Sequence, residues 1–411
     1  MKASHPHLAA KGGMGPSRPG LLKQLNAREI LTLLRNNSPC SRADLVRLSG
    51  LSAPTVSSGV AYLERKNLVK RLGPGSSNGG RPPDMLRFNS DYGYVVGVDL
   101  GGSNIRMAVA DLDGKLVALW NVSTRGNRTP AKIVRLIESG VRELLKQNHI
   151  PNRKAFAIGI GAPGITDVQA GIVLSAPHLE NWRNVPLREM LETKLTIPCV
   201  IENDVNVAAL GESWNGSAKG VSNFIFIAIG TGIGAGIYIN DRLYHGSDWA
   251  AGEVGYLLVP GAPAAAIAVN QPGALESAIG GHGIEQAWRK ICLASGRNHG
   301  DRLLKATEVF ELAERGDSQA RKILHSTAQI LANAISNISV LLNTSLVVFG
   351  GAIGTSEPLL KATRHLLDRN DFARPRLTIS LLGKDAQLHG AIRLALDKVE
   401  SALLMVEDGR S

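Results

Sequence analysis

Cysteine is scarce in this chain. The 411 residues contain only three, Cys40, Cys199 and Cys292, which lie far apart and form no Cys-x-x-Cys pair. This spacing suits reduced thiols and argues against a disulfide framework or a four-cysteine zinc site. We therefore expect three free, buried thiols.

Long apolar runs are also lacking. Stretches such as residues 224–229 are interrupted by glycine or charge well before the ~18 consecutive residues that a membrane helix requires. The N-terminus offers only the apolar patch 8–10, which is shorter than the apolar region of a secretory signal. These absences predict a cytoplasmic protein with no membrane partner, and the length predicts two or three domains.

Positive charge is concentrated at the start of the chain. Residues 1–92 contain 14 Lys and Arg against 5 Asp and Glu, whereas the other 319 residues contain 32 against 30. A basic segment suits a polyanion such as nucleic acid, although many solvated surfaces carry similar charge. The charge alone therefore indicates a partner class only weakly.

The first 92 residues predict a small helical domain behind an arm. Residues 1–20 are rich in glycine and proline and show no apolar period, so we interpret them as a disordered arm. Apolar residues then recur at helical spacing after Asn26, a possible N-cap. Ser41 opens a sequence close to a capping box, and Ser52 is expected to cap a third helix. The expected buried stripes consist of Ile30, Leu31, Leu34, Val56, Val60 and Leu63.

Residues 21–92 are predicted to form a winged helix-turn-helix domain. Two short helices joined by a tight turn at Gly50, the second opening with Ser and Thr, are typical of a helix-turn-helix. An ordinary three-helix bundle is the alternative on this pattern alone. Residues 68–72 and 85–88 favour the first interpretation, because they predict two strands around a wing loop. The residues predicted to contact DNA are Arg42, Ser52, Thr55, Ser57, Ser58, Lys66 and Arg81.

Three glycine-rich turns follow apolar strands in the rest of the chain. Turns without side chains let backbone amides approach an anionic group, so they predict phosphate binding, with Asp99 facing a magnesium ion. They match neither a Walker loop nor a dinucleotide fingerprint, because no Gly-Lys-Ser/Thr follows and the second turn leads into a strand. The predicted phosphate-binding residues are Asp99, Gly101, Gly102, Ser103, Gly230, Thr231, Gly232, Gly350 and Gly351.

An Asn-Asp pair lies between the first two glycine turns. Asn203 and Asp204 follow a predicted strand, 198–201, and precede a predicted helix, 205–212. There an aspartate could accept a proton from a sugar hydroxyl while the asparagine binds a neighbouring hydroxyl. The alternative is that Asp204 merely caps the helix.

In combination, these segments resemble the ROK family, named for repressors, open reading frames and sugar kinases. The resemblance covers about residues 20–400 and implies an actin-like fold of two α/β lobes for residues 93–411. The winged helix in front is similar to the repressor branch of the family. The matching motifs are DLGGSN at 99–104, ENDVN at 202–206, GTGIGAGI at 230–237, GEVGY at 252–256 and LES at 275–277.

The resemblance also implies a sugar site. Carboxylates suit polyols because each accepts two directional hydrogen bonds and carries no competing donor. In a kinase of this family, Asp204 would also be the catalytic base. The residues implied in sugar binding are Asn203, Asp204, Gly164, Glu253, Tyr256 and Glu276.

One segment departs from the family pattern. Members commonly have histidine at the position of Tyr256, followed by a cysteine-rich run that binds structural zinc. Here residues 257–274 contain neither cysteine nor histidine, so we expect no such zinc. We expect this loop to be held instead by packing of Leu257, Leu258, Ile267 and Val269.

These patterns favour a sugar-responsive transcriptional repressor. Its expected partners are double-stranded operator DNA and a sugar effector, its expected assembly is a homodimer or dimer of dimers, and it would need no cofactor. The alternative is an ATP-dependent sugar kinase with an accessory DNA-binding domain, which would need ATP and magnesium. Asp204 and two glycine turns favour the kinase, whereas the basic domain and the altered loop favour the repressor.

Overall fold

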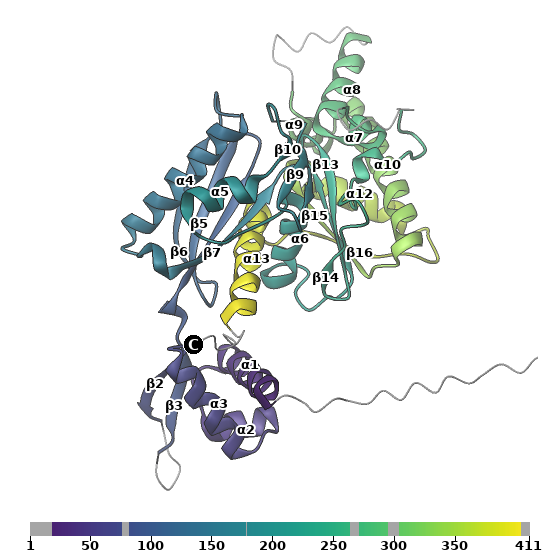
Figure 1. Ribbon diagram of the computed structural model, residues 1–411. Coiled ribbons are helices and arrows are strands. Elements are labelled where there is room, and N and C mark those ends of the chain that lie inside the picture. Colours follow the sequence, from purple (N-terminus) through teal and green to yellow (C-terminus); the bar gives the residue numbers. More distant parts are fainter. Residues whose placement is uncertain (1–18, 76–81, 178, 264–270, 295–303, 404–411) are drawn as a thin grey trace, which may run out of the picture. The chain divides into compact units, whose positions relative to one another are not determined.

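The structure is a computed structural model that describes residues 19–75, 82–177, 179–263, 271–294 and 304–403 (Figure 1). The chain divides into two compact units. The first comprises Met1–Tyr92 with Glu400–Ser411, and the second comprises Gly93–Val399.

The first unit has the helices and strands of a winged helix-turn-helix. Its apolar stripes are buried as predicted, with Ile30, Leu34 and Leu63 fully inaccessible to solvent. The strands form one sheet in the order β1-β3-β2. The elements are α1 (Pro19–Asn37), β1 (Cys40–Ser41), α2 (Arg42–Ser49), α3 (Ala53–Arg65), β2 (Val69–Pro74) and β3 (Asp84–Phe88).

Two of the three predicted helix starts are confirmed. Ser41 and Asp44 form a reciprocal capping box at α2, and the Ser52 hydroxyl accepts from the Thr55 amide at α3. The predicted cap at Asn26 is wrong, because Asn26 lies inside α1. The helix begins earlier, at Pro19, and proline is favourable in a first turn because the amide that it lacks would have no helical partner there.

The second unit contains two five-stranded sheets with the same topology. The first has the order β11-β7-β4-β5-β6 and the second β14-β13-β12-β15-β16. In each, the strands on one side of a central strand, β4 or β12, are joined by two successive antiparallel pairings, and those on the other side by two successive parallel pairings. This repetition confirms the predicted architecture of two α/β lobes.

The first lobe carries α4 and α5. Burial of Ile133, Ile137 and Val141 fixes the inner face of α4, which packs with Trp120 and Val122 of β6. The elements are β4 (Tyr94–Leu100), β5 (Asn104–Asp111), β6 (Leu116–Ser123), α4 (Pro130–Gln147), β7 (Ala155–Ala162), β8 (Ile165–Asp167), β9 (Ile172–Ser175), β10 (Arg183–Val185), α5 (Leu187–Leu195) and β11 (Cys199–Asn203).

The second lobe carries six helices in the described residues, and the long α10 packs against α12 and α9. The strands are β12 (Phe224–Ile229), β13 (Ile233–Ile239), β14 (Arg242–Leu243), β15 (Leu346–Gly350) and β16 (Arg376–Ile379). The helices are α7 (Ala274–Ile279), α8 (Gly281–Ala294), α9 (Ala306–Glu314), α10 (Ser318–Leu342), α11 (Gly351–Gly354) and α12 (Glu357–Leu367). Short 3-10 turns occur at Ser90–Tyr92, Asn152–Lys154, Val254–Tyr256 and Gly383–Asp385.

Two helices, α6 (Asp204–Asn215) and α13 (Ala386–Leu403), lie between the sheets (Figure 1). A Cβ at Gly159 of β7 would lie 2.0 Å from the Ala391 carbonyl oxygen of α13. A Cβ at Gly390 would lie 1.7 Å from the Val207 carbonyl oxygen of α6. Glycine therefore lets α13 approach both the first sheet and α6 more closely than any other residue would.

Two further observations test the predictions about membrane helices and thiols. Among the described helices, none combines the length and the apolar character that crossing a membrane would take. None of the three cysteines is joined in a disulfide, as predicted; Cys40 and Cys199 are buried, but Cys292 is only partly buried. The expectation of burial is therefore wrong for Cys292, which lies near the end of α8.

Candidate functional site

Asn203 and Asp204 lie at the junction of β11 and α6. The Asn203 side chain is the N-cap of α6: its Oδ1 accepts from the amides of Val205 at 2.9 Å and Asn206 at 3.0 Å. Its Nδ2 donates to the Gly164 carbonyl oxygen at 3.0 Å. Gly164 has φ 84°, and a Cβ there would lie 2.0 Å from the Ser175 carbonyl oxygen. Asn203 and Gly164 therefore fix the position of the end of β11.

Asp204 is the first residue of α6 rather than its cap, so the capping alternative is wrong for this residue. Its Oδ1 accepts from the Val205 amide at 2.9 Å. Burial raises the pKa of Asp204 to about 7, with further increases from the nearby charges of Asp99 and Glu253. Asp204 can therefore change protonation near neutral pH, which a solvated aspartate cannot do.

The remaining acids approach Asp204 from the second lobe. Burial and the charge of Glu276 raise the pKa of Glu253. Burial and the charges of both glutamates raise the pKa of the Tyr256 hydroxyl. Glu276 Oε2 also accepts from the Ile233 amide at 2.9 Å, at the start of β13. The structure therefore brings Asp204, Glu253, Tyr256 and Glu276 into one electrostatically connected group.

An ion pair that the sequence analysis missed joins β4 and β5, the two strands on either side of the first glycine turn. Arg106 donates from Nε and Nη2 to Asp99 Oδ2 at 3.0 and 2.8 Å, and from Nη1 to Asp385 at 2.8 Å. Burial raises the pKa of Asp99, and Arg106 opposes that increase. Gly102 and Ser103 are exposed in this turn. A guanidinium thus neutralises part of the charge predicted to face magnesium.

The other two glycine turns differ in their accessibility. In the second, Thr231 is exposed, and the Gly230 amide is bonded to the Gly232 carbonyl oxygen at 3.0 Å. In the third, Gly350 is buried, and a Cβ there would lie 2.3 Å from the Phe226 ring. Gly351 has φ 78° and would meet the Ile229 carbonyl oxygen at 2.4 Å. Packing therefore accounts for the buried Gly350, whereas the exposed Gly351 requires glycine because of its positive φ and its close approach to the Ile229 backbone.

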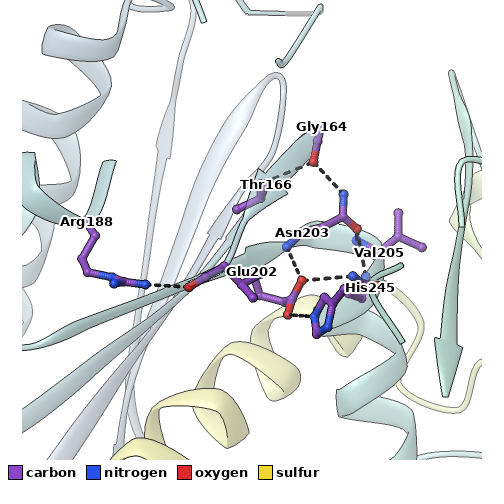
Figure 2. A network of polar contacts seen from close by, with 9 residues as sticks. Gly164, Thr166, Arg188, Glu202, Asn203, Val205 and His245 are labelled. Atoms are coloured by element: carbon purple, nitrogen blue, oxygen red, sulfur yellow. Dashed lines mark hydrogen bonds and ion pairs between the residues drawn. The ribbon is translucent and has the colours of Figure 1, made fainter. Parts of the chain in front are cut away.

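A second missed pair, Glu202 and His245, lies beside Asn203. His245 Nε2 is 2.7 Å from Glu202 Oε2, and the Glu202 side chain is almost completely buried (Figure 2). The signals for it in the sequence are weak. Glu202 is adjacent to the predicted site, but a lone histidine 43 residues later shows no pattern that links it to that acid.

The described residues among those predicted to bind DNA lie in the first unit, on α2, on α3 and at the two caps of α3. Ser52, Ser57, Ser58 and Lys66 are exposed, and Thr55 is partly buried with its hydroxyl 2.8 Å from that of Ser52. Arg42 pairs with Glu64 at 3.5 Å. Arg81 lies outside the described residues. The structure therefore presents a row of small hydroxyl side chains on α3, at the first turns of the helix.

The loop that departs from the family pattern is described only in part. Leu257 packs against the core of the second lobe, but Leu258 is 62% exposed, so the expected packing role of Leu258 is wrong. Ile267 and Val269 lie outside the described residues. Among the described residues, no group of three His, Cys, Asp or Glu side chains could hold a metal ion.

We expect protein purified without chelator to contain far less than one zinc ion per chain. The reason is the sequence of residues 257–274, which offers no thiolate or imidazole. Elemental analysis by inductively coupled plasma mass spectrometry would measure the ratio, with buffer dialysate as control. Stoichiometric zinc that survives dialysis would contradict this expectation.

Comparisons with known proteins agree with these motifs. The model of the ROK family matches residues 95–398. The xylose repressor of Bacillus subtilis (strain 168) is 30% identical over 92% of this chain and 96% of its own length. A glucokinase of Halalkalibacterium halodurans is 32% identical over 73% of this chain and 94% of its own length.

A solved structure shows the same fold. It is a ROK family transcriptional regulator described as a homolog of the E. coli MLC protein, with 22% identity and a TM-score of 0.77. It covers 93% of this chain and 98% of its own chain. Because the family model spans most of the chain, including every acid and glycine turn described above, this protein belongs to the ROK family.

Proposed function

We propose that this protein is a sugar-responsive transcriptional repressor. The first unit binds operator DNA, and the acids around Asp204 bind the sugar effector. The observation that carries the proposal is the presence of both parts in one chain. A winged helix-turn-helix precedes a group of partly buried acids suited to hydroxyls, and a relative matching 92% of the chain is named a xylose repressor.

The chemistry of the site favours a polyol. Asp204, Glu253 and Glu276 provide carboxylate oxygens, which accept hydrogen bonds from sugar hydroxyls. Tyr256 adds a hydroxyl that both donates and accepts. Binding would regulate transcription only through different affinities of the sugar for the DNA-bound and free states. A coupling of ~1 to 3 kcal/mol changes operator affinity roughly 5- to 150-fold.

A sugar kinase is the second candidate, and two observations favour it. The pKa of Asp204, about 7, lies near the optimum for a general base, and one relative is named a glucokinase. The pairing of Asp99 with Arg106 counts against it, because this pair reduces the negative charge available to a magnesium ion. ATP and magnesium are therefore proposed only for the kinase, and the repressor needs neither.

One experiment separates the two functions. Operator binding and ADP release would be measured with the same panel of pentoses, hexoses, amino sugars and polyols. We expect at least one sugar to change operator affinity without sugar-dependent ADP release. Sugar-dependent ADP release would support the kinase, and unchanged operator affinity across the panel would contradict the repressor.

The proposal also includes the domain boundaries, assembly and location. We assign residues 1–20 to an arm, 21–92 to the DNA-binding domain and 93–411 to the sugar-binding domain. A homodimer or dimer of dimers suits a two-fold operator, because each copy presents one recognition helix to one half-site. Such a protein acts where the chromosome is, in the cytoplasm.

Arg81→Ala is expected to weaken operator binding by ~1 to 3 kcal/mol, because an arginine on the predicted wing would be lost from the minor groove. The loss should shrink when adjacent A·T pairs are replaced by G·C pairs. Fluorescence anisotropy at fixed salt would measure it. Arg315→Ala, an exposed arginine in the second unit, is the control. Equal operator affinity of Arg81→Ala and wild type would remove the wing from the proposed interface.

A further inference from the structure

Glu202 is a buried carboxylate whose two oxygens are both engaged. Oε1 accepts from the Asn203 amide at 2.8 Å and from Asn206 Nδ2 at 3.0 Å. Oε2 contacts His245 Nε2 at 2.7 Å. A buried carboxylate is costly unless it is both paired and hydrogen-bonded. Figure 2 shows the carboxylate between Asn203 and His245, which is therefore placed to supply the compensating charge.

His245 reaches Glu202 from the other lobe. It lies two residues after β14 of the second sheet, whereas Glu202 lies in β11 of the first. The His245 carbonyl oxygen also accepts from the Ala251 amide at 3.2 Å, which closes the loop that leads to Glu253. The side chain of His245 thus contacts the strand end that precedes Asp204. Its backbone contacts the loop that leads to Glu253.

The loop around His245 contains an unfavourable backbone conformation. Trp249 has φ 62°, and its ring meets the His245 ring edge-on with the centroids 5.5 Å apart. A bulky residue in the left-handed region persists only where its surroundings enforce it, and such residues cluster at functional sites. The hydrogen bond and charge of Glu202 also raise the pKa of His245, which favours the charged pair.

We propose that His245 is a positioning residue for the effector site. Its contact with Glu202 fixes the position of the Glu253 loop relative to the β11–α6 junction, so that Asp204 and Glu253 face one sugar. The inference rests on the proposed function. His245 does not touch the sugar in this arrangement; it acts through Glu202 and through the loop.

Hydrogen exchange in the absence of sugar tests the positioning itself. The Val205 and Asn206 amides are bonded to Asn203, so loosening the junction should expose them. We expect His245→Ala to accelerate their exchange roughly 10-fold or more, with α4 unchanged. Glu202→Gln should do the same, and His245→Ala should add little in the Glu202→Gln background. His365→Ala, an exposed histidine on α12, is the matched control. Unchanged exchange in both single variants, or additive effects in the double variant, would overturn the proposal.

Sugar affinity tests the functional consequence. D-xylose and D-glucose would be titrated into wild type and variants, with operator affinity measured alongside. We expect His245→Ala to lower the affinity for whichever of the two sugars binds wild type by ~10-fold or more, while sugar-free operator affinity stays within about twofold. His245→Gln, which can still donate to Glu202, should recover part of the loss. Accelerated exchange with unchanged sugar affinity would overturn the effector-site role. If wild type binds neither sugar but exchange is faster in the variants, these two sugars are excluded as effectors. The role of His245 in holding the β11–α6 junction would still be supported.

Discussion

Asp204→Asn is expected to weaken sugar binding by ~1 to 3 kcal/mol, about 5- to 150-fold, because a charged acceptor for a hydroxyl is replaced by a weaker one. Operator affinity without sugar should barely change, since the residue lies in the second unit. Isothermal titration calorimetry and operator anisotropy would measure the two affinities. Unchanged sugar affinity would exclude Asp204 from the site.

The same variant distinguishes the kinase. If Asp204 is a catalytic base, its loss removes the acceptor for the hydroxyl proton, and turnover should fall by ~100-fold or more while sugar still binds. We expect the wild type to show no such turnover to lose. Sugar-dependent ADP production by wild type that disappears in Asp204→Asn would contradict the proposal of a repressor without kinase activity.

Asp204→Asn should also change how stability depends on pH. The folded pKa of about 7 lies above the unfolded value of ~3.9, so between these values the folded state binds more protons than the unfolded state. The contribution of Asp204 to the stability of the wild type should therefore fall as pH rises from about 4 to about 7. The variant lacks this loss and should be more stable than wild type at pH 8, by roughly 1 to 2 kcal/mol after allowing for the partial exposure of Asp204.

Thermal denaturation from pH 4 to pH 8 would measure that difference. Asp371→Asn, at an exposed position after α12, is the matched control and should follow the wild-type curve. A parallel pH dependence of wild type and Asp204→Asn would contradict the raised pKa. A partly buried acid whose ionisation lowers the stability of the fold is typical of a site maintained for binding.

Gly390→Ala is expected to destabilise the second unit by ~3 kcal/mol or more. Glycine to alanine inside a helix normally stabilises by up to about 1 kcal/mol, so the expected sign is reversed here. The reason is contact: the new Cβ would lie 1.7 Å from the Val207 carbonyl oxygen and 3.0 Å from the Gly211 amide nitrogen. Backbone atoms cannot rotate away, so α13 and α6 must separate.

Urea denaturation followed by circular dichroism would measure the loss. Lys398→Ala, an exposed position on the same helix, should stay within about 0.5 kcal/mol of wild type. Because α6 begins at Asp204, Gly390→Ala should also weaken sugar binding. Unchanged stability would mean that the two helices tolerate a wider separation than the structure shows.

Features that depend on neighbours in the chain could be predicted from the sequence. Ser41 and Ser52 cap their helices through amides three residues away, and the spacing of Ile30, Leu34, Val56 and Leu63 is the period of the helices that bury them. The glycine turns and the ENDVN segment likewise indicated the family without a structure. These interactions span a few residues, so the pattern of residue types specifies them almost alone.

Other features required the complete fold. Nothing local indicates that Arg106 meets Asp385, 279 residues away, or that Glu202 meets His245. The alternative that Asp204 caps α6 is wrong, because the cap is Asn203. Both residue types suit a cap, and only the backbone geometry selects one of them. The repeated strand order of the two sheets also escaped detection, since each strand offers backbone groups that any neighbour can pair.

The sequence by itself thus determined the family, the helix caps at Ser41 and Ser52 and the buried stripes of the first unit, and it indicated the acids of the candidate site. Only the tertiary structure decided which distant charges meet: it placed Arg106 on Asp385 and His245 on Glu202. The physical reason is that a charge can be satisfied by many partners of opposite sign. The choice among them is made by the strands and helices that bring two side chains within hydrogen-bonding distance, and that choice depends on packing over the whole lobe.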